Sequence, residues 1–557
     1  MTKELRDATI IAAGGTVKRP LKDIFGDIIN VKSFGAAGDG ATDDTDAIQA
    51  ALIEAFGGLG GYPDTHTVDN RFANKPVYFP TGVYRVTKTL HEASVDNGLV
   101  FGDGPEASVI VYDGPLGTVM PTFTATRTGA AVTSITIGTQ GTGWPPGAHY
   151  FLSFSETGVS DRAKAHVIVD EDGKITQGSI QINYGGSYSV TPTVEMFAYT
   201  PLFRTNGLRH SVMERIGFDM PAPTLVNSYT VCVMLDRWKL INNGGNVHQD
   251  SFYNVATKNA THGWYLGFSG DTGPQGGGTS TSSVSIGTGA KTFSSAYTFG
   301  GPIVSVRLRY TAVSDPTKWV EGLITSISGS GPYTITINVD KTSGTGTISN
   351  WTFQNTEYIG FNAMGSEMVF VDCDCTDHDT SGIYLGGQNV LSINVYGGVF
   401  TRIGNAVRAA ASSNNSIAGG AALNNERGGS FAVVDGCTFV ESRGCDYYGE
   451  GSTGLVFQNI TSINTQPDNG SFSHGPFLGR FPHPCVMRNV RHTNADHGAG
   501  QLIWWLYEFG TIIEFCSFGH GKAKDAAGEF MPVYSRASTY LNSDPFTRSA
   551  GFPQEES

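Results

Sequence analysis

Two carboxylates, Asp377 and Glu441, occupy matching places in two similar stretches of the sequence. Each follows a cysteine by four residues, Cys373 in one stretch and Cys437 in the other, and Thr401 holds the equivalent place between them. If the stretches stack as coils, both carboxylates lie in one outward column, two strand spacings or roughly 9–10 Å apart. Such a pair suits acid–base hydrolysis of a glycosidic bond, because a water must fit between acid and sugar.

Other polar side chains lie close to this pair in the sequence. Arg402 and Arg443 could hold a substrate carboxylate or lower the pKa of a nearby aspartate. His378 and Asp379 share the turn of Asp377 and are candidates for substrate binding and catalysis, respectively. The alternative for all these carboxylates is a solvated face, because Asx side chains often satisfy their own turns.

A second predicted column combines tyrosines with a carboxylate. The stretches align at four glycines, which are Gly263, Gly382, Gly404 and Gly444. Two residues after each glycine, the alignment gives one outward position, which is occupied by Tyr265, Tyr384, Ala406 and Asp446. Sugar rings pack their C–H faces on aromatic rings, so stacked tyrosines beside a carboxylate suit a polysaccharide groove. Asp446 is therefore a further catalytic candidate, and Tyr448 a further binding candidate.

These residues belong to an internal repeat. Stretches 369–387, 392–409, 432–449 and 454–466 each combine alternating apolar residues, a small or Cys position and a polar turn. The aligned positions, which step by 24, 40, 23, 30 and 26 residues, are Cys373, Gly397, Cys437, Ile460, Val490 and Cys516. Stretch 251–267 fits the same frame with Val255 in register. A coil of about two dozen residues predicts a parallel β-helix, with the aligned cysteines buried inside it.

The segment 31–52 predicts how the first coil is covered. It contains an apolar strand through Val31 and Phe34, a Gly-Asp-Gly turn and then helix-capping oxygens at Thr42, Asp43 and Asp44. Helical spacing follows at Ala47, Ile48, Ala51 and Leu52. A short amphipathic helix in this place would shield the open end of a β stack from water.

This segment and its continuation at 75–84 resemble the start of pectate-lyase-like right-handed β-helices, as in bacteriophage tailspikes and exopolysaccharide depolymerases. Residues 16–27 resemble a tailspike neck, with an irregular arm as the alternative. Two stretches, about 130–198 and 279–354, resemble small modules of phage tail proteins. The predicted fold class is all-β: a right-handed parallel β-helix of the pectin-lyase type, as a homotrimer, with two small inserted β modules.

The predicted domain organisation follows from the repeat and its interruptions. It comprises a neck or attachment segment (1–30), first coils with a capping helix (31–129), an inserted β module (130–198), β-helix coils (199–270), an inserted tail-type module (271–356), coils with the candidate site (357–520) and a closing segment (521–557).

Composition and motifs exclude several classes of function. A formal net charge of −14 argues against a nucleic-acid partner, because the phosphate backbone would be repelled. No apolar run reaches membrane-spanning length, and the first residues lack the apolar core of a signal peptide. The Gly519-His520-Gly521 tripeptide lacks the partner motifs of polygalacturonases and is interpreted as a turn. No motif calls for a metal or cofactor, so none is expected.

The resemblance implies a phage tailspike that binds and depolymerises a bacterial surface polysaccharide, such as capsule or O-antigen, by endo-glycoside hydrolysis. It also implies attachment to the phage tail or baseplate through the N-terminus, and a place in the virion after assembly in the host cytoplasm. Three alternatives stay open. They are a polysaccharide lyase on the same fold, a non-cleaving adhesin, and a bacterial exopolysaccharide-modifying enzyme.

Overall fold

The computed structural model describes most of the chain. The described residues are 27–56, 75–92, 98–155, 163–206, 210–225, 228–236, 250–266, 276–300, 307–355, 365–385, 392–404, 421–425, 431–442, 455–463 and 486–493, together with the strands named below that lie outside these ranges.

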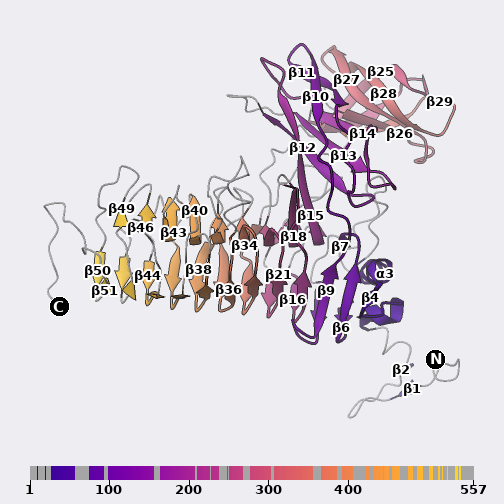
Figure 1. The fold of residues 1–557 in the computed structure, drawn as a ribbon. Coiled ribbons are helices and arrows are strands. Elements are labelled where there is room, and N and C mark those ends of the chain that lie inside the picture. Colours follow the sequence, from indigo (N-terminus) through magenta and orange to yellow (C-terminus); the bar gives the residue numbers. More distant parts are fainter. Residues whose placement is uncertain are drawn as a thin grey trace.

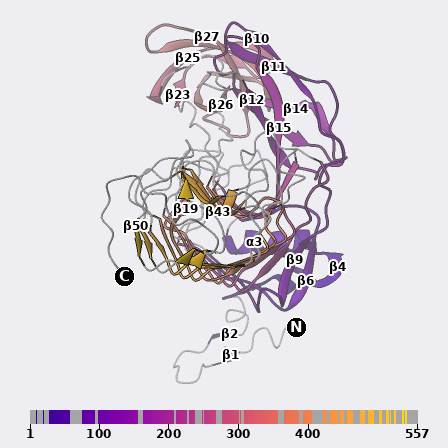
Figure 2. The same ribbon diagram turned by 60° about the vertical axis from the view of Figure 1, so that its left-hand side comes forward.

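Three long parallel sheets form a β-helix, and from β5 onward the chain visits them in the order sheet 1, sheet 2, sheet 3 (Figures 1 and 2). Sheet 1 has 12 strands: β3 (Ile29–Asn30), β5 (Val77–Phe79), β8 (Leu99–Gly102), β16 (Val212–Glu214), β20 (Ser251–Tyr253), β32 (Val369–Val371), β35 (Ile393–Tyr396), β38 (Phe431–Asp435), β41 (Val456–Gln458), β44 (Val486–Arg488), β47 (Ile512–Glu514) and β50 (Tyr534–Arg536).

Sheet 2 also has 12 strands: β4 (Asp39–Asp43), β6 (Gly82–Val86), β9 (Ser108–Tyr112), β17 (Gly217–Asp219), β21 (Ala256–Lys258), β33 (Asp374–Thr376), β36 (Val399–Thr401), β39 (Thr438–Val440), β42 (Thr461–Ile463), β45 (Arg491–Thr493), β48 (Ser517–Phe518) and β51 (Thr539–Tyr540). The β-helix strands of sheet 3 are β7 (Leu90–Glu92), β15 (Thr193–Asn206), β18 (Ser228–Asp236), β22 (His262–Leu266), β34 (Ser381–Leu385), β37 (Ala421–Asn425), β40 (Cys445–Glu450), β43 (His474–Arg480), β46 (Gln501–Trp505) and β49 (Ala523–Lys524).

The first insertion extends sheet 3 beyond the β-helix. Its strands are β10 (Phe123–Thr128), β11 (Ala131–Ile137), β12 (His149–Ser155), β13 (Lys164–Val169) and β14 (Ile175–Tyr184). The long strand β15 joins the two parts, because its first half pairs antiparallel with β12 and its second half pairs parallel with β18. The insertion therefore projects from the sheet 3 side of the molecule (Figure 1).

The second insertion is a closed antiparallel barrel. Its strands are β23 (Gly276–Ser280), β25 (Gly289–Gly300), β26 (Arg307–Ala312), β27 (Trp319–Ser328), β28 (Tyr333–Ser343) and β30 (Trp351–Asn355), with the small pair β24 (Val284–Ser285) and β29 (Thr347–Ile348) beside it. The buried guanidinium of Arg307 binds Glu321 and Asp340 within the barrel and also donates to the Ile182 carbonyl of the first insertion. The two insertions thus contact each other directly. Two further pairs are β1 (Thr9–Ile10) with β2 (Arg19–Pro20), and β19 (Val247–His248) with β31 (Gly365–Ser366).

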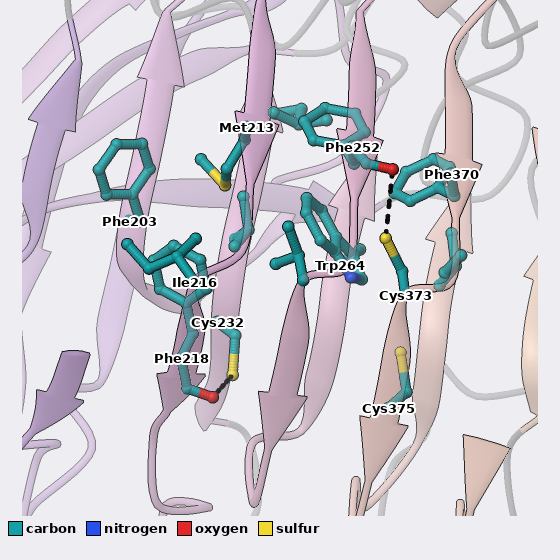
Figure 3. Close-up of a cluster of buried hydrophobic side chains, with 14 of the residues drawn as sticks. Phe203, Met213, Ile216, Phe218, Cys232, Phe252, Trp264, Phe370, Cys373 and Cys375 are labelled. Atoms are coloured by element: carbon teal, nitrogen blue, oxygen red, sulfur yellow. Dashed lines mark hydrogen bonds between the residues drawn. The ribbon is translucent and has the colours of Figure 1, made fainter. Parts of the chain in front are cut away.

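Stacked side chains of like kind fill the interior of the β-helix. Phe252 lies with its ring centroid 4.8 Å from those of both Phe370 and Trp264, and Figure 3 shows these rings between neighbouring coils. Burying each such side chain stabilises the fold by roughly 1.5–3 kcal/mol. Cys373 points into this core and donates to the Phe252 carbonyl, while burial raises the pKa of its thiol to about 12. The described cysteines Cys232, Cys373, Cys375 and Cys437 are all buried free thiols, as predicted; Cys516 lies outside the described residues.

The first coil is covered by the predicted helix, α3 (Thr45–Phe56), which buries Ile48, Ala51 and Leu52. The preceding apolar strand was predicted incorrectly. Residues Val31–Phe34 form a 3₁₀ helix, η1, because the Asn30 side chain accepts from the Lys32 amide and caps a turn there. The predicted neck helix lies largely outside the described residues.

Asp44 stabilises the segment that joins η1 to α3. It is buried, and its carboxylate accepts from the backbone amides of Ala37 at 2.6 Å and Gly38 at 3.0 Å. We expect Asp44→Ala to lower the free energy of unfolding by about 1–3 kcal/mol, because two buried amides lose a charged acceptor. Urea unfolding followed by circular dichroism measures this loss. The exposed Asp46→Ala is the matched control, and equal stability of the two variants would contradict the assigned role.

The predicted fold class is confirmed for the single chain: it is a pectin-lyase-like parallel β-helix with two small antiparallel insertions. Within the described ranges, no helix is both long enough and apolar enough to cross a membrane.

Candidate active site

The corner between sheets 2 and 3 carries a column of polar side chains in strained backbone. Asn259, Asp377, Arg402 and Glu441 occupy equivalent places on four successive coils, and all have positive φ, between 52° and 66°. Each backbone N–H donates to a carbonyl of the next coil, for example Asp377 to Thr401 at 3.0 Å and Arg402 to Val440 at 2.8 Å. Left-handed backbone is well tolerated by Asn and Asp but costs of order 1 kcal/mol for Arg and Glu. The same conformation recurs at the corner between sheets 1 and 2, at Asn254, Asp372 and Asn459, so it belongs to the geometry of the coils.

The shared column of Asp377 and Glu441 agrees with the sequence analysis. The strand registers place both residues directly after sheet 2 strands, with one coil between them. That coil is formed by β35, β36 and β37, and these strands pair directly with the coils on either side, so one coil of described strands separates the two carboxylates. Two strand spacings correspond to about 9.4–9.8 Å between equivalent backbone positions. The catalytic role of the pair stays a prediction.

The residue between the two carboxylates differs from the prediction. Arg402, not Thr401, stands in the column, because the position equivalent to Cys373 is Gly398, not Gly397. Both glycines have positive φ, and both are needed at this tight turn. A Cβ on Gly397 would lie 2.2 Å from Asp372 Oδ1, and one on Gly398 would lie 2.2 Å from the Cys373 carbonyl oxygen. The extra glycine shifts the following strand by one residue.

Arg402 binds Asp377 through two hydrogen bonds. Its Nε donates to Asp377 Oδ1 and its Nη2 to Oδ2, each at 2.7 Å. The Asp377 carboxylate raises the pKa of the Arg402 guanidinium, and the nearby charge of Glu441 acts in the same direction. The ion pair is partly exposed, with 38% and 37% of the two side chains accessible, so it can meet a ligand. Arg402 thus holds a carboxylate of its own chain, which agrees with the predicted pairing with a nearby aspartate, whereas its predicted binding of a substrate carboxylate stays a prediction. Arg443 lies outside the described residues.

His378 does not line a surface, contrary to the prediction. It is 1% exposed and points into the β-helix, where its Nε2 lies 2.9 Å from Thr257 Oγ1 and 3.1 Å from the Thr257 carbonyl oxygen. Burial lowers its pKa to about 4, so the imidazole is neutral at pH 7. Asp379 is half-buried between the corner and β34, and its amide donates to the Ala260 carbonyl.

Asp446 also lies inside the β-helix, where a polymer cannot reach it. It is fully buried, and the Ser462 hydroxyl donates to its carboxylate. The prediction assumed strict alternation along sheet 3, but two consecutive residues point inward at the start of these strands. A Cβ on Gly263 would lie 2.8 Å from His378 Nε2, while the next residue, Trp264, also belongs to the core. Asp446 occupies the position of Gly263, not that of the tyrosines.

The tyrosine column is real but largely covered. Tyr265 and Tyr384 pair in register, as predicted, and their ring centroids lie 5.1 Å apart. They are only 1% and 5% exposed, and Phe151 of the first insertion packs against their cluster. The next two members are Asn424 and Tyr448, in place of Ala406 and Asp446, because residues 405–420 intervene before β37. Tyr448 is therefore placed in this column by register.

The sequence analysis missed three residues that extend the aromatic cluster. Tyr199 and Tyr229 are half-buried and stacked, with centroids 4.8 Å apart. The buried ring of His262 lies 4.9 Å from Tyr384, and in the described structure neither of its nitrogens has a hydrogen-bond partner. The sequence signal for Tyr199 and Tyr229 was their matching places in two strands. That these two strands pair could not be predicted before the position of the first insertion was known.

The corner between sheets 2 and 3 can therefore present two carboxylates and a guanidinium to a ligand that lies along the β-helix, next to the aromatic cluster. The described residues contain no group of three or more His, Cys, Asp or Glu side chains arranged to hold a metal ion.

Comparisons with known proteins match the chain in part. The family described as "Rhamnogalacturonase A/epimerase, pectate lyase-like" matches residues 28–129. "Alginate lyase 7" of Azotobacter vinelandii is 50% identical over 58 residues, which are 10% of this chain and 5% of that protein. "Glucan 1,3-beta-glucosidase" of Cochliobolus carbonum is 32% identical over 101 residues, which are 16% of this chain and 11% of that protein. The chain thus matches only a small part of the length of these relatives.

Solved structures of similar shape have little sequence identity to this chain. The tailspike of E. coli bacteriophage HK620, in complex with a hexasaccharide, has a TM-score of 0.37 at 10% identity, covering 97% of this chain and 71% of that chain. The A-module of the mannuronan C-5 epimerase AlgE6 of Azotobacter vinelandii has a TM-score of 0.34 at 10% identity, covering 92% and 100%.

Proposed function

We propose that this protein is a phage tailspike that binds and cleaves a bacterial surface polysaccharide by endo-glycoside hydrolysis at the corner between sheets 2 and 3. One observation carries the proposal: Asp377, Arg402 and Glu441 stand in one outward column on three successive coils, with the arginine bound to the first carboxylate. The short matches to a lyase, epimerases and a glucosidase support action on a polysaccharide as the general class.

The proposed mechanism divides the work between the two carboxylates. Glu441, which is exposed, donates a proton to the leaving glycosidic oxygen as the bond from that oxygen to the anomeric carbon breaks. Asp377 takes a proton from a water whose oxygen bonds to the anomeric carbon from the opposite side. Arg402 orients the Asp377 carboxylate through its two hydrogen bonds. Water is consumed, and each cleavage leaves one new reducing end.

The tailspike role further implies a homotrimer attached to a phage tail through its N-terminus. Three copies would present three sites to a repeating polymer, and such multivalency raises the overall strength of attachment without new contacts.

A polysaccharide lyase is the second candidate, because short matches include an alginate lyase and enzymes that act on mannuronan. A lyase would need a uronic-acid polymer and a base beside a group that neutralises the sugar carboxylate. Arg402 could serve as that neutralising group only by leaving Asp377.

Digestion of purified capsule and O-antigen from a panel of strains tests the proposal. We expect one polymer to be shortened to oligosaccharides of defined mass, with new reducing ends and no unsaturated sugar. An ultraviolet-absorbing product with an unsaturated end would establish the lyase instead. Tight binding to a polymer that keeps its length would establish an adhesin.

A further inference from the structure

The outer face of sheet 1 carries a continuous uncharged stripe along the β-helix. On eight successive coils the first outward residue of the sheet 1 strand is neutral and half-exposed, and these residues are Leu99, Val212, Ser251, Val369, Asn394, Val433, Val456 and Val486. Six of the eight are Leu or Val. Their half-exposure leaves apolar surface in contact with solvent in the single chain.

The neighbouring outward column of sheet 1 is mixed, with aromatic residues on some coils and the charged Glu214, Asp435 and Arg488 on others. Tyr253 and Tyr396 are 39% and 38% exposed, and Tyr78 and Phe101 stack with centroids 4.9 Å apart. Sheet 2 differs, because both of its outward columns contain charged residues, Asp374 and Arg491 in one and Asp219 and Lys258 in the other. Sheet 3 bears the first insertion on its side (Figure 1). Of the four outward columns of sheets 1 and 2 over these coils, the stripe is thus the one without a charged residue.

We infer that this stripe is the surface through which copies of the chain associate side by side, around an axis parallel to the β-helix. The inference rests on the homotrimer of the proposed function and adds the surface through which its copies meet. Around such an axis each residue meets the same residue of its copies, so a charge would face equal charges and would be unfavourable. A column without a single charge over eight coils fits this requirement.

The repeat of the stripe favours a second copy over an unrelated partner. Its residues recur once per coil, about every 4.8 Å, over about 34 Å. Another copy of the chain offers the same repeat over the same length, so apolar side chains can interlock along the whole stripe. A face about 34 Å long and about 10 Å wide is small for one stable pair, which typically needs about 800 Å² per partner. The stripe is therefore inferred to be the part of the interface next to the axis, and the homotrimer of the proposed function sets the expected number of copies.

Matched charge variants test the assignment. Val433→Glu/Val456→Glu puts two charges on the stripe, and Thr438→Glu/Thr461→Glu puts two on sheet 2 in the same two coils. We expect mass photometry to give about three times the 59.2 kDa chain mass for the wild-type protein and for the sheet 2 variant, but a monomer for the stripe variant. Circular dichroism should be the same for all three proteins.

A stripe variant that remains trimeric would overturn the inference. So would a monomeric wild-type protein, and cleavage of short oligosaccharides by that monomer would leave the proposed hydrolysis standing. If the charged variant is insoluble, Val456→Cys replaces it, with Thr461→Cys as its control. Mild oxidation should give a covalent dimer on a denaturing gel with Val456→Cys and none with Thr461→Cys. Absence of the Val456→Cys dimer would equally overturn the inference.

Discussion

Asp377→Asn and Glu441→Gln should each lower kcat for polymer cleavage by at least about a hundredfold. Both changes keep the shape of the side chain but remove its proton chemistry, and general acid–base catalysis typically contributes about 10²–10⁴-fold. Release of reducing ends under saturating polymer measures this loss. Binding of the polymer, followed by surface plasmon resonance, should change little, because both changes keep the size and the hydrogen-bonding capacity of the side chain.

A matched control separates this effect from a general change at a corner. Asp372 has positive φ at the corner between sheets 1 and 2 in the same coil as Asp377, so Asp372→Asn should leave kcat unchanged. All three variants should unfold within about 1 kcal/mol of the wild-type protein, since a partly exposed ion pair such as Asp377–Arg402 contributes about 0–1 kcal/mol. Normal cleavage by both active-site variants would mean that the column is a solvated face, and Asp379→Asn would then be the next test.

The protein should lose stability steeply as the pH falls from about 6.5 towards 4. Burial lowers the pKa of His166 and His262 to about 3 and that of His378 to about 4, against an ordinary value of 6.5. Within this window the unfolded chain binds protons that the folded protein does not, so the free energy of unfolding falls as the pH falls. Each histidine contributes a slope of up to about 1.4 kcal/mol per pH unit, and the three together about 4 kcal/mol per unit.

Urea unfolding at pH 7.5, 6.5, 5.5 and 4.5 measures this slope. The loss should be small above pH 7, where both states are neutral at these sites. His378→Gln should make the slope shallower by up to about 1.4 kcal/mol per unit, whatever its effect on stability at pH 7.5. His210→Gln, which replaces an exposed histidine, is the matched control. A free energy of unfolding that stays constant from pH 6.5 to 4.5 would contradict the buried, neutral state of these rings.

The sequence by itself determined the fold and the two carboxylates of the main column. Alternating apolar residues at a repeat of about two dozen residues can bury one face only by stacking coil on coil, and this pattern predicted the β-helix. The same repeat placed Asp377 and Glu441 one above the other, because each follows an inward cysteine by the same number of residues. It also paired Tyr265 with Tyr384.

The tertiary structure alone decided which side chains meet at the candidate site. The alternation of inward and outward side chains holds only within one strand, and it can start on either face after each corner. The two glycines at 397 and 398 moved Arg402 into the column, and the paired inward residues that begin the sheet 3 strands carried Asp446 into the core. Burial of the tyrosines depends on an insertion far away in the sequence, whose position no local pattern encodes. The columns followed from the repeat length of the coils, whereas the contacts within them followed from bends and insertions that do not repeat.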